Sequence, residues 1–544
     1  MLNWIDQRVP VRYIAFFGTV ALWVISALQL VVGQASLLWV LLLTGLVVLG
    51  VHDLQQTRHA ILRNYPIIGH LRFLLEFIRP ELRQYFIESD HDAVPFSRSQ
   101  RSLVYARAKG ESDKRPFGTQ MDIHAIGYEW LTHSISPSVI PSHDFRVPVG
   151  GSTCTQPYSM SLFNVSAMSF GALSANAIMA LNLGAKKGGF AHDTGEGSIS
   201  RYHREHGGDL IWEIGSGYFG CRNDDGTFNS ERFKKNALSP QVKMIEIKLS
   251  QGAKPGHGGV LPGPKVTPEI AEARGVPVGV DCVSPAAHSS FSNPTELLKF
   301  VQTLRELSEG KPVGFKLCIG HPWEWFGIAK AMTTTGILPD FIVVDGSEGG
   351  TGAAPVELTD HMGMPMLEGL RLVHNTLVGL NLRQHIRLGA SGKIISGFDV
   401  MRTLALGADW CNSARGFMFA LGCIQAQTCH TGNCPTGVTT QDPKRQIALV
   451  VPNKADRVKN FHQQTLESVQ EMLQASGLNQ PSDLSLKHIM RRVSDHEVQS
   501  LDSLMPSLAA GSLLSSHDLK GLFQQYWADA SPDHFQWNPG RAKA

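Results

Sequence analysis

The sequence predicts an α/β protein built on a (β/α)8 barrel, preceded by a pair of apolar helices and followed by a mainly helical C-terminal segment. Short apolar runs alternate with helical patterns between about residues 160 and 420, which indicates a parallel sheet. The length of this region and the glycine-rich segments after its apolar runs favour a barrel over an open doubly wound sheet.

Seven apolar runs are predicted barrel strands: residues 162–167, 244–249, 278–282, 314–319, 341–345, 387–390 and 410–413. A further, weakly marked strand is expected around residues 190–193. Helical patterns lie between the strands, for example at residues 174–186, 294–308 and 398–406. Four parts are expected along the chain. They are a transmembrane hairpin (1–53), a lead-in that packs on the barrel (54–150), the barrel itself (151–453) and a helical extension (454–544).

No Asp, Glu, Lys or Arg occurs from residue 13 to residue 51. Residues 13–32 are about long enough to cross a bilayer and residues 36–51 are slightly short, so a transmembrane hairpin is predicted. A buried core hairpin is the alternative, and a signal peptide would have a shorter apolar core. Arg8 and Arg12 precede the pair, Arg58 and Arg63 follow it, and the connecting turn is uncharged. The positive-inside rule therefore predicts a multi-pass protein of the inner membrane with its main domain in the cytoplasm.

The formal net charge of +2 is too small to indicate a nucleic-acid partner, and none is expected. The pattern of the eight cysteines does not indicate the disulfide framework of a secreted protein.

Glycine-rich or charged segments follow the predicted strands, where the active groups of a barrel gather. Small residues after the first strand would let a planar ring lie on the backbone: Ser166, Ala167, Met168 and Ser169. Glu196 stands among glycines in HDTGEGSIS, and QGAKPGHGG covers residues 251–259. Lys316 lies on a predicted buried strand and needs a partner there. Gly349 and Gly350 belong to DGSEGGTGAAP.

A phosphate site is predicted at the last two strand ends, where backbone N–H groups and cations can converge on a dianion. Its expected residues are Gly392, Lys393, Gly397, Arg415 and Gly416. No Walker A motif occurs, and no GxGxxG after a predicted strand is convincing as a dinucleotide-binding motif. A mononucleotide such as FMN therefore fits better than NAD or ATP.

Three cysteines, Cys423, Cys429 and Cys434, lie within twelve residues in GCIQAQTCHTGNCPTGV. Thiolates suit iron–sulfur clusters and zinc. Three ligands are compatible with a three-iron cluster, or with a zinc site completed by His430. Ordinary buried thiols are the remaining interpretation.

Several of these motifs together resemble the FMN-binding synthase domain of glutamate synthases: SAMSFGALS, TGEG, EIKLSQGAKPGHGGVLPGPKV, DGSEGGTGA, LGADW and CHTGNCPTGV. The likeness covers roughly residues 115–450 and is closest to the stand-alone members with a membrane hairpin. It implies FMN at the barrel mouth, 2-oxoglutarate over the flavin, and a 3Fe-4S cluster held by the three cysteines. The family's substrate-binding residues fall on Gln251, Lys254, Arg274 and Ser292, and its flavin-contacting lysine falls on Lys316.

The sequence departs from the family pattern in two respects. His257 stands where glutamate synthases usually carry Glu, beside the expected substrate pocket. The glutaminase domain, the β-helical C-terminal domain and any pyridine-nucleotide domain are not found in this sequence. The nitrogen donor is therefore expected to be ammonia, or glutamine through a separate glutaminase. Electrons are expected from ferredoxin or another redox protein.

The resemblance predicts that reduced FMN passes hydride to the imine of 2-oxoglutarate and ammonia, giving glutamate. Lys316 would stabilise negative charge on the flavin, and Glu196 would handle protons, unless Glu196 only caps a helix. Two other functions are considered. One is an FMN oxidoreductase acting on another 2-oxo acid, 2-hydroxy acid or amine, with His192 as the candidate base. The other is a membrane-tethered electron-transfer subunit.

Overall fold

The computed structural model describes residues 11–90, 95–515 and 519–537, so Arg8 lies outside the described residues. The chain forms two compact units, Met1–Asp92 and Ala93–Ala544. Each unit is described by itself.

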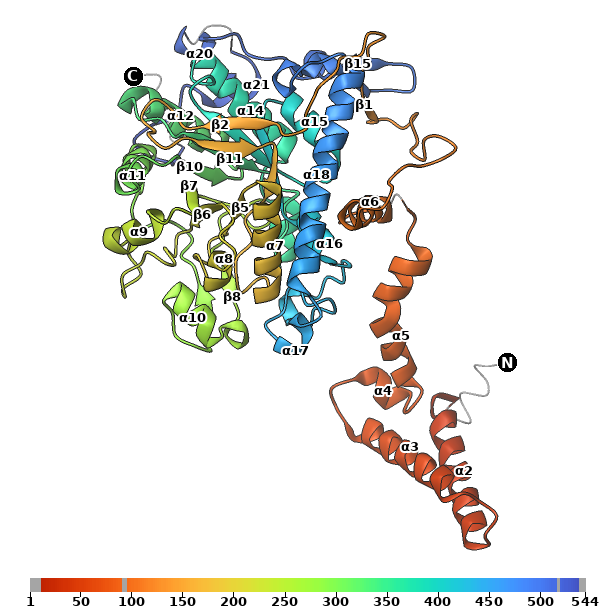
Figure 1. Ribbon diagram of the computed structural model, residues 1–544. Coiled ribbons are helices and arrows are strands. Elements are labelled where there is room, and N and C mark those ends of the chain that lie inside the picture. The colour runs from red at the N-terminus through yellow and green to blue at the C-terminus, as the bar shows by residue number, and fades with distance from the viewer. Residues whose placement is uncertain (1–10, 91–94, 516–518, 538–544) are drawn as a thin grey trace. The chain divides into compact units, whose positions relative to one another are not determined.

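The first unit begins with two long apolar helices, α2 (Ile14–Val31) and α3 (Leu37–Gln55), which pack against each other (Figure 1). Gly50 of α3 lies so close to Phe16 of α2 that a Cβ there would overlap the ring. Trp23 Nε1 also donates a 2.8 Å hydrogen bond to Thr44 Oγ1 across the pair. Both helices are long and apolar enough to cross a membrane, although a signal sequence can pass the same test. Shorter helices follow: α4 (Ala60–Asn64), α5 (Gly69–Leu82) and the π-helical turn η2 (Arg83–Ile87).

The second unit contains a closed barrel of eight parallel strands, which confirms the predicted fold class. Around the barrel the strands follow the order β10, β11, β12, β13, β4, β5, β6, β7. Their bounds are β4 (Phe163–Val165), β5 (His192–Asp193), β6 (Leu210–Ile214), β7 (Val242–Lys248), β10 (Val313–Leu317), β11 (Phe341–Asp345), β12 (Arg387–Ser391) and β13 (Trp410–Ser413).

One predicted barrel strand is wrong and one strand was missed. Residues 278–282 are not a barrel strand, because Val278 and Val280 are each 56% exposed. Only Cys282–Val283 (β9) is extended there, and it pairs antiparallel with Val260–Leu261 (β8) outside the barrel. The missed strand is β6, a buried LIWEI run whose glutamate breaks the apolar pattern.

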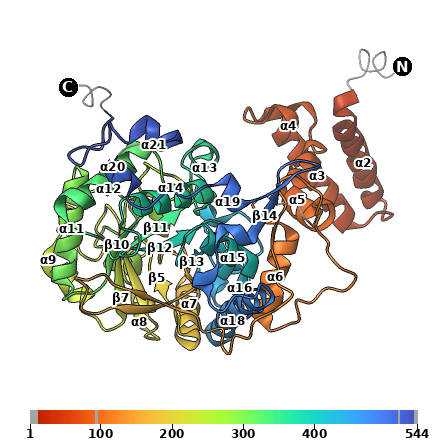
Figure 2. The same ribbon diagram turned by 90° about the horizontal axis from the view of Figure 1, so that it is seen from above.

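Helices surround the barrel strands (Figure 2). Those predicted at residues 174–186, 294–308 and 398–406 are α7 (Ala175–Gly188), α11 (Pro294–Leu307) and α15 (Gly397–Ala405). Each begins after a residue whose side chain accepts a backbone hydrogen bond from the first turn, namely Ser174, Asn293 and Ser396. These caps satisfy N–H groups that helix starts leave free.

The amino-terminal end of the barrel is closed by a hairpin of β2 (Arg146–Val149) and β3 (Tyr158–Ser161). Val149 and Met160 of this hairpin pack in one buried cluster with strand residues that include Phe341 and Trp410. The hairpin therefore leaves the opposite, carboxyl-terminal end as the open mouth.

The segment after the barrel is mainly helical, as predicted, and begins with the 25-residue helix α18 (Val451–Ala475). This helix packs on α7, on α6 (Arg98–Lys109), on α15 and on α16 (Arg415–Leu421). An unpredicted three-stranded sheet joins the lead-in to the C-terminal part: β1 (Glu129–Leu131), β14 (Ile489–Arg492) and β15 (Val498–Ser500). The barrel is thus enclosed by segments from both sides of its sequence.

Arg305→Met should lower the free energy of unfolding by about 3–5 kcal/mol, because it leaves a buried carboxylate without its cation. Arg305 of α11 donates to Asp340 Oδ2 from Nε at 3.1 Å and from Nη2 at 3.0 Å, and both side chains are buried. The measurement is the urea midpoint of the full chain in detergent, followed by circular dichroism. Lys299→Met, at an exposed position of the same helix, is the control and should change little. Equal midpoints for the two variants would contradict the role given to this pair.

Candidate active site

A cavity of about 370 Å³ lies at the carboxyl-terminal mouth of the barrel. Loops after six of the eight strands contribute to its wall, together with Pro95 and Phe96 from the lead-in. Most of the residues singled out in the sequence line it: Ser166, Ala167, Met168, Ser169, Glu196, Gln251, Lys316, Gly349, Gly350, Gly392, Lys393, Arg415, Gly416, Cys423 and Cys429. Folding therefore brings the predicted flavin, proton and cysteine residues to one cavity.

The segment after β4 forms one wall with its backbone. Gly195 has a left-handed backbone (φ 64°), and a Cβ there would lie 2.7 Å from the amide nitrogen of Ser169. Only glycine allows this close approach between the two loops. The wall is thus made of main chain and small side chains, as a planar ligand would require.

Two cations, Lys393 and Arg415, lie at one end of the cavity. Their charged groups lie over the ring of Phe96, at 5.8 Å for Lys393 Nζ and 4.9 Å for Arg415 Cζ. Arg415 Nη2 donates to the carbonyl oxygen of Glu348 at 2.7 Å. Burial lowers the pKa of Lys393, and the charge of Arg415 lowers it further. An anion between the two cations would relieve this repulsion.

The glycines around these cations have different environments. A Cβ at Gly350 would lie 2.6 Å from Arg415 Nη1, so this glycine makes room for the guanidinium. Gly397 lies away from the cavity, at the start of α15, where a Cβ would lie 2.7 Å from Ser468 Oγ of α18. The amide groups of Ile395 and Ser396 before it already donate to Asp399 Oδ2. The start of α15 is therefore used for packing and capping.

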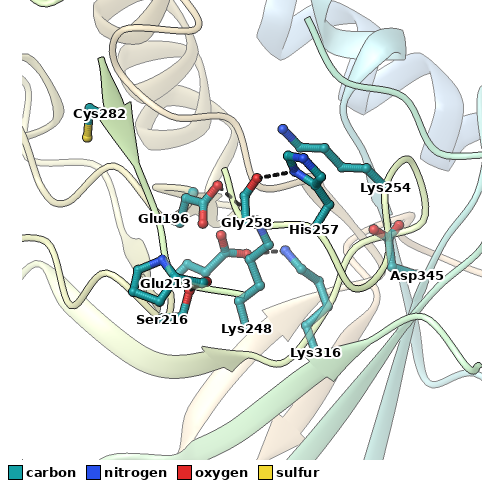
Figure 3. A network of polar contacts seen from close by, with 12 residues as sticks. Glu196, Glu213, Ser216, Lys248, Lys254, His257, Gly258, Cys282, Lys316 and Asp345 are labelled. Carbon is teal, nitrogen blue, oxygen red and sulfur yellow. Dashed lines mark hydrogen bonds and ion pairs between the residues drawn. The ribbon is translucent and has the colours of Figure 1, made fainter. Parts of the chain in front are cut away.

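Glu196 forms an ion pair with Lys248 at the end of β7, with 3.0 Å between Oε1 and Nζ (Figure 3). Burial alone would raise the pKa of Glu196, but Lys248, followed by Arg274 and Lys254, holds it below its ordinary value. Glu196 is therefore an ionised carboxylate at neutral pH. It does not cap the next helix, α8 (Arg201–Arg204), which starts five residues later.

Lys316 lines the base of the cavity and has the partners that a buried lysine needs. Its ammonium forms ion pairs with Glu213 and, at 3.2 Å, with Glu246. Asp193 completes a group of three buried carboxylates whose oxygens lie within 4.8 Å of one another. Burial and then Glu213 raise the pKa of Asp193 to about 7. Burial would lower the pKa of Lys316, but these carboxylates raise it well above its ordinary value.

The predicted substrate residues fall in three different places. Gln251 lines the main cavity, whereas Lys254 and His257 line an adjoining cavity of about 780 Å³ that shares Gly349, Gly350, Lys393 and Arg415 with it. Lys254 Nζ donates to the carbonyl oxygen of Ala353 at 3.3 Å, and burial lowers the pKa of Lys254. The imidazole of His257 bonds the carbonyl oxygen of Gly258 at 2.8 Å.

Arg274 is buried beside the loop that carries Glu196. A Cβ at Gly197 would lie 3.0 Å from Arg274 Nη2, and the same nitrogen donates to the carbonyl oxygen of Phe170 at 3.3 Å. Within the described part of the chain, Arg274 Nε has no hydrogen-bond partner. Ser292 lies elsewhere: it is exposed, and its hydroxyl donates to Glu296 Oε2 at 2.9 Å in the first turn of α11.

The cysteine loop follows α16 directly. Cys423 and Cys429 line the cavity, and Cys434 is buried behind them. Burial would raise the pKa of Cys434, but hydrogen bonds from Thr436 and Thr439 lower it to about 7, which favours a thiolate. Gln425 (φ 61°) and Gln427 (φ 56°), between the first two cysteines, hold left-handed backbones that cost energy in non-glycine residues. The loop is therefore held in a constrained shape around its thiols.

Sequence reasoning missed Lys248, Glu213, Glu246 and Asp193. The signal was present in β7, where Glu246 and Lys248 alternate along a buried strand and so point to the same side. A charged pair at that spacing in a barrel strand indicates an ionic interior. Phe96 could not have been found this way, because it comes from a distant segment.

Two comparisons with known proteins, one with family models and one with individual sequences, indicate the same family. The family model described as "Conserved region in glutamate synthase" matches residues 146–479. The glutamate synthase large subunit-like protein YerD of Bacillus subtilis is 39% identical over 496 residues, which covers 84% of this chain and 94% of that protein. A mutant flavocytochrome b2 with pyruvate bound is similar in structure (TM-score 0.40, 13% identity, 83% of this chain and 91% of the other), a likeness that carries no functional inference.

Two further relatives match over only part of their length. An archaeal-type glutamate synthase (NADPH) of Thermotoga neapolitana is 36% identical over 61% of this chain and 63% of its own length. The archaeal glutamate synthase (NADPH) of Methanocaldococcus jannaschii is 36% identical over 58% of this chain and 59% of its own length. This chain thus spans less than two thirds of these two relatives. On the family match and the similarity to YerD, the chain belongs to the glutamate synthase family.

Proposed function

We propose that this protein is a glutamate synthase-type oxidoreductase that reduces the imine of 2-oxoglutarate and ammonia to glutamate. One observation carries the proposal. A single cavity is lined by glycine-rich loops that bear two cations, by Gln251 and by two cysteine thiols. Such a cavity combines a place for an anionic flat cofactor, a place for a polar substrate and a set of soft metal ligands.

FMN fits the main cavity by the chemistry of its walls. Lys393 and Arg415, with Gly392 and Gly416, would hold the phosphate, and the backbone of Ser166–Ser169 with Gly349 and Gly350 would face the ring. When bound, FMN would supply the hydride for the reduction. Lys316 would place a positive charge under the ring.

The substrate carboxylates would be held by Lys254 and Arg274, with Gln251 between the cofactor and the substrate. Arg274 lines neither cavity, so its place in the proposal rests on the family resemblance and on its charge near Glu196. Glu196, ionised beside Lys248, would take a proton from the nitrogen as ammonia adds to the keto group and return it to the hydroxyl that leaves as water. Ser292 is bonded to Glu296, and the proposal gives it only a structural role in α11.

A 3Fe-4S cluster on Cys423, Cys429 and Cys434 would pass electrons to the cavity from ferredoxin or another redox protein. Among the described residues, only Asp193, Glu213 and Glu246 bring three ligand atoms within 4.8 Å of one another. At least one pair of the three thiol sulfurs therefore lies more than 4.8 Å apart, which is wider than two ligands around one zinc ion with a zinc–sulfur distance of about 2.3 Å. That spacing favours a larger core, and a zinc site with His430 is the less supported alternative.

Membrane attachment through α2 and α3 is part of the proposal. Most of their apolar side chains are exposed within the unit, as they would be in contact with lipid. Both ends of the pair would lie on the cytoplasmic side of the inner membrane, as the flanking arginines indicate.

A hydroxy-acid oxidase is not favoured by the geometry. Its candidate base, His192, is fully buried on β5 and is not among the residues that line the cavity. Burial lowers its pKa to about 3.

Turnover of the full-length protein in detergent tests the function. With reduced ferredoxin, 2-oxoglutarate and ammonia, the protein should form glutamate, and omission of 2-oxoglutarate should abolish electron consumption. Glutamine in place of ammonia would sustain electron consumption dependent on 2-oxoglutarate only when a glutaminase is added to release its ammonia. A protein that binds cofactors yet forms no glutamate with either donor would instead be an electron-transfer subunit.

Arg415→Met should weaken flavin binding about 30-fold, since it removes a charged hydrogen bond of about 2 kcal/mol to the phosphate. The measurement is the dissociation constant of FMN by fluorescence quenching on flavin-depleted protein. Arg445→Met, at an exposed position, should bind FMN normally. Equal affinity in both variants would show that the phosphate does not lie at Arg415.

Lys254→Met should raise KM for 2-oxoglutarate about 30-fold while the flavin spectrum stays unchanged, because Lys254 is not among the residues that line the main cavity. Steady-state kinetics provides the measurement, with Lys235→Met as the exposed control. If KM does not change, the substrate carboxylates are bound elsewhere.

Cys429→Ser should abolish the iron signal and electron entry from ferredoxin, yet leave FMN bound. Anaerobically purified wild-type protein should contain about three irons per chain and give an electron paramagnetic resonance signal when oxidised. Cys154→Ser, whose thiol donates to the carbonyl oxygen of Gly310 at 3.2 Å, is the control. Zinc in place of iron would overturn the electron path.

A further inference from the structure

An apolar face lies on α5, in the unit that also holds the two long apolar helices. Leu71, Leu74, Leu75, Ile78 and Leu82 recur at intervals of three or four residues and therefore share one side of the helix. Leu71, Leu74 and Leu75 are 53%, 54% and 51% exposed. The unit itself leaves this row of leucines largely uncovered.

The exposed face continues into η2. Tyr85, Phe86 and Ile87 are 54%, 82% and 75% exposed. Large aromatic and aliphatic side chains in adjacent exposed positions are typical of a segment that enters the boundary between lipid headgroups and acyl chains.

Arginines border the leucine row along one flank. Arg72, Arg79 and Arg83 are spaced seven and four residues apart, so they lie on the same flank, about a quarter turn from the leucines. All three are exposed. Long cationic side chains beside an apolar face can reach lipid phosphates while their stems cover the apolar surface.

The start of α5 is fixed to the end of α3. Asp53, on the last turns of α3, is fully buried and accepts a 2.9 Å hydrogen bond from the amide of Ile67. It also bonds His70 Nε2 of α5 at 2.9 Å. Gly69 lies close against Leu62 of α4, since a Cβ there would be 3.0 Å from Leu62 Cδ2. α5 therefore begins where the second long apolar helix ends.

We propose that α5 and η2 lie on the membrane surface, with the leucine face in the boundary between headgroups and acyl chains and the arginines at the lipid phosphates. This inference rests on the proposed membrane attachment through α2 and α3. The segment would hold the chain against the bilayer at the point where it leaves the membrane.

Photocrosslinking of the full-length protein tests the proposal in vesicles of phosphatidylcholine and phosphatidylglycerol. A benzoylphenylalanine replaces Leu75 on the leucine face, or Glu76 on the polar flank as the matched control. Mass spectrometry should find lipid adducts at Leu75 and several-fold fewer at Glu76. Crosslinks from Leu75 to residues 93–544 of the same chain, or to a second copy, in place of lipid would overturn the proposal.

The same probe at Leu42, an exposed residue in the middle of α3, tests the membrane attachment separately from the surface position of α5 and η2. Lipid adducts at Leu42 without adducts at Leu75 would remove the surface helix and leave the membrane attachment standing. No lipid adducts at Leu42 would contradict the attachment itself and the surface helix with it.

A second variant tests the leucines directly. Leu71→Ser, Leu74→Ser and Leu75→Ser combined should abolish lipid adducts from a probe at Phe86. Because these leucines are more than half exposed, their loss removes little packing within the unit. An unchanged yield of lipid adducts would show that the leucine face does not hold the segment on the membrane.

Discussion

The ammonium of Lys316 is the charge on which the interior of this barrel depends. It extends from β10 and pairs with Glu213 of β6 (Figure 3). It also pairs with Glu246 of β7, and Asp193 of β5 lies within the same group. Buried carboxylates are costly unless a cation compensates them. The four strands are neighbours in the closed barrel, so closure creates the ion cluster and the cluster in turn places Lys316 below the cavity.

The pKa values in this cluster describe how its charge is balanced. One ammonium faces three carboxylates, and burial raises the pKa of both Asp193 and Glu246. The cluster therefore retains a proton near neutral pH. Nearer the mouth, Glu196 shows the opposite behaviour, because Lys248 and the further cations Arg274 and Lys254 keep it ionised. The site thus has an ion cluster that retains a proton below and an ionised carboxylate nearer the mouth.

Much of this arrangement could be predicted from the sequence. The strands at β11 and β13 were predicted at their observed bounds, since each is a plain apolar run. β6 was missed because Glu213 interrupts its apolar pattern. Residues 278–282 were mistaken for a barrel strand because Val278 and Val280 give an apolar pattern, although both valines are exposed. Local patterns thus identify strands well when their buried side chains are apolar. They fail when a buried strand carries a charged side chain.

The site residues that could be predicted from the sequence, and those that could not, differ for a similar reason. Gly392, Lys393 and Arg415 could be placed together because barrel strands end at one mouth, and the structure does bring them to one cavity. Phe96 under the two cations and Lys248 beside Glu196 depend on contacts between segments far apart in sequence, which no local pattern records. Ser292 was chosen by resemblance alone, and its contact with Glu296 is decided by the first turn of α11.

The central claim is that one cavity couples the cysteine loop to reduction of 2-oxoglutarate, and a single-turnover experiment tests it most directly. Full-length protein would be reduced anaerobically with ferredoxin, freed of excess donor, and mixed rapidly with 2-oxoglutarate and ammonia. The account predicts that flavin absorbance returns as about one glutamate forms per flavin reoxidised. A protein that stays reduced after mixing, or reoxidises without forming glutamate, would contradict the account.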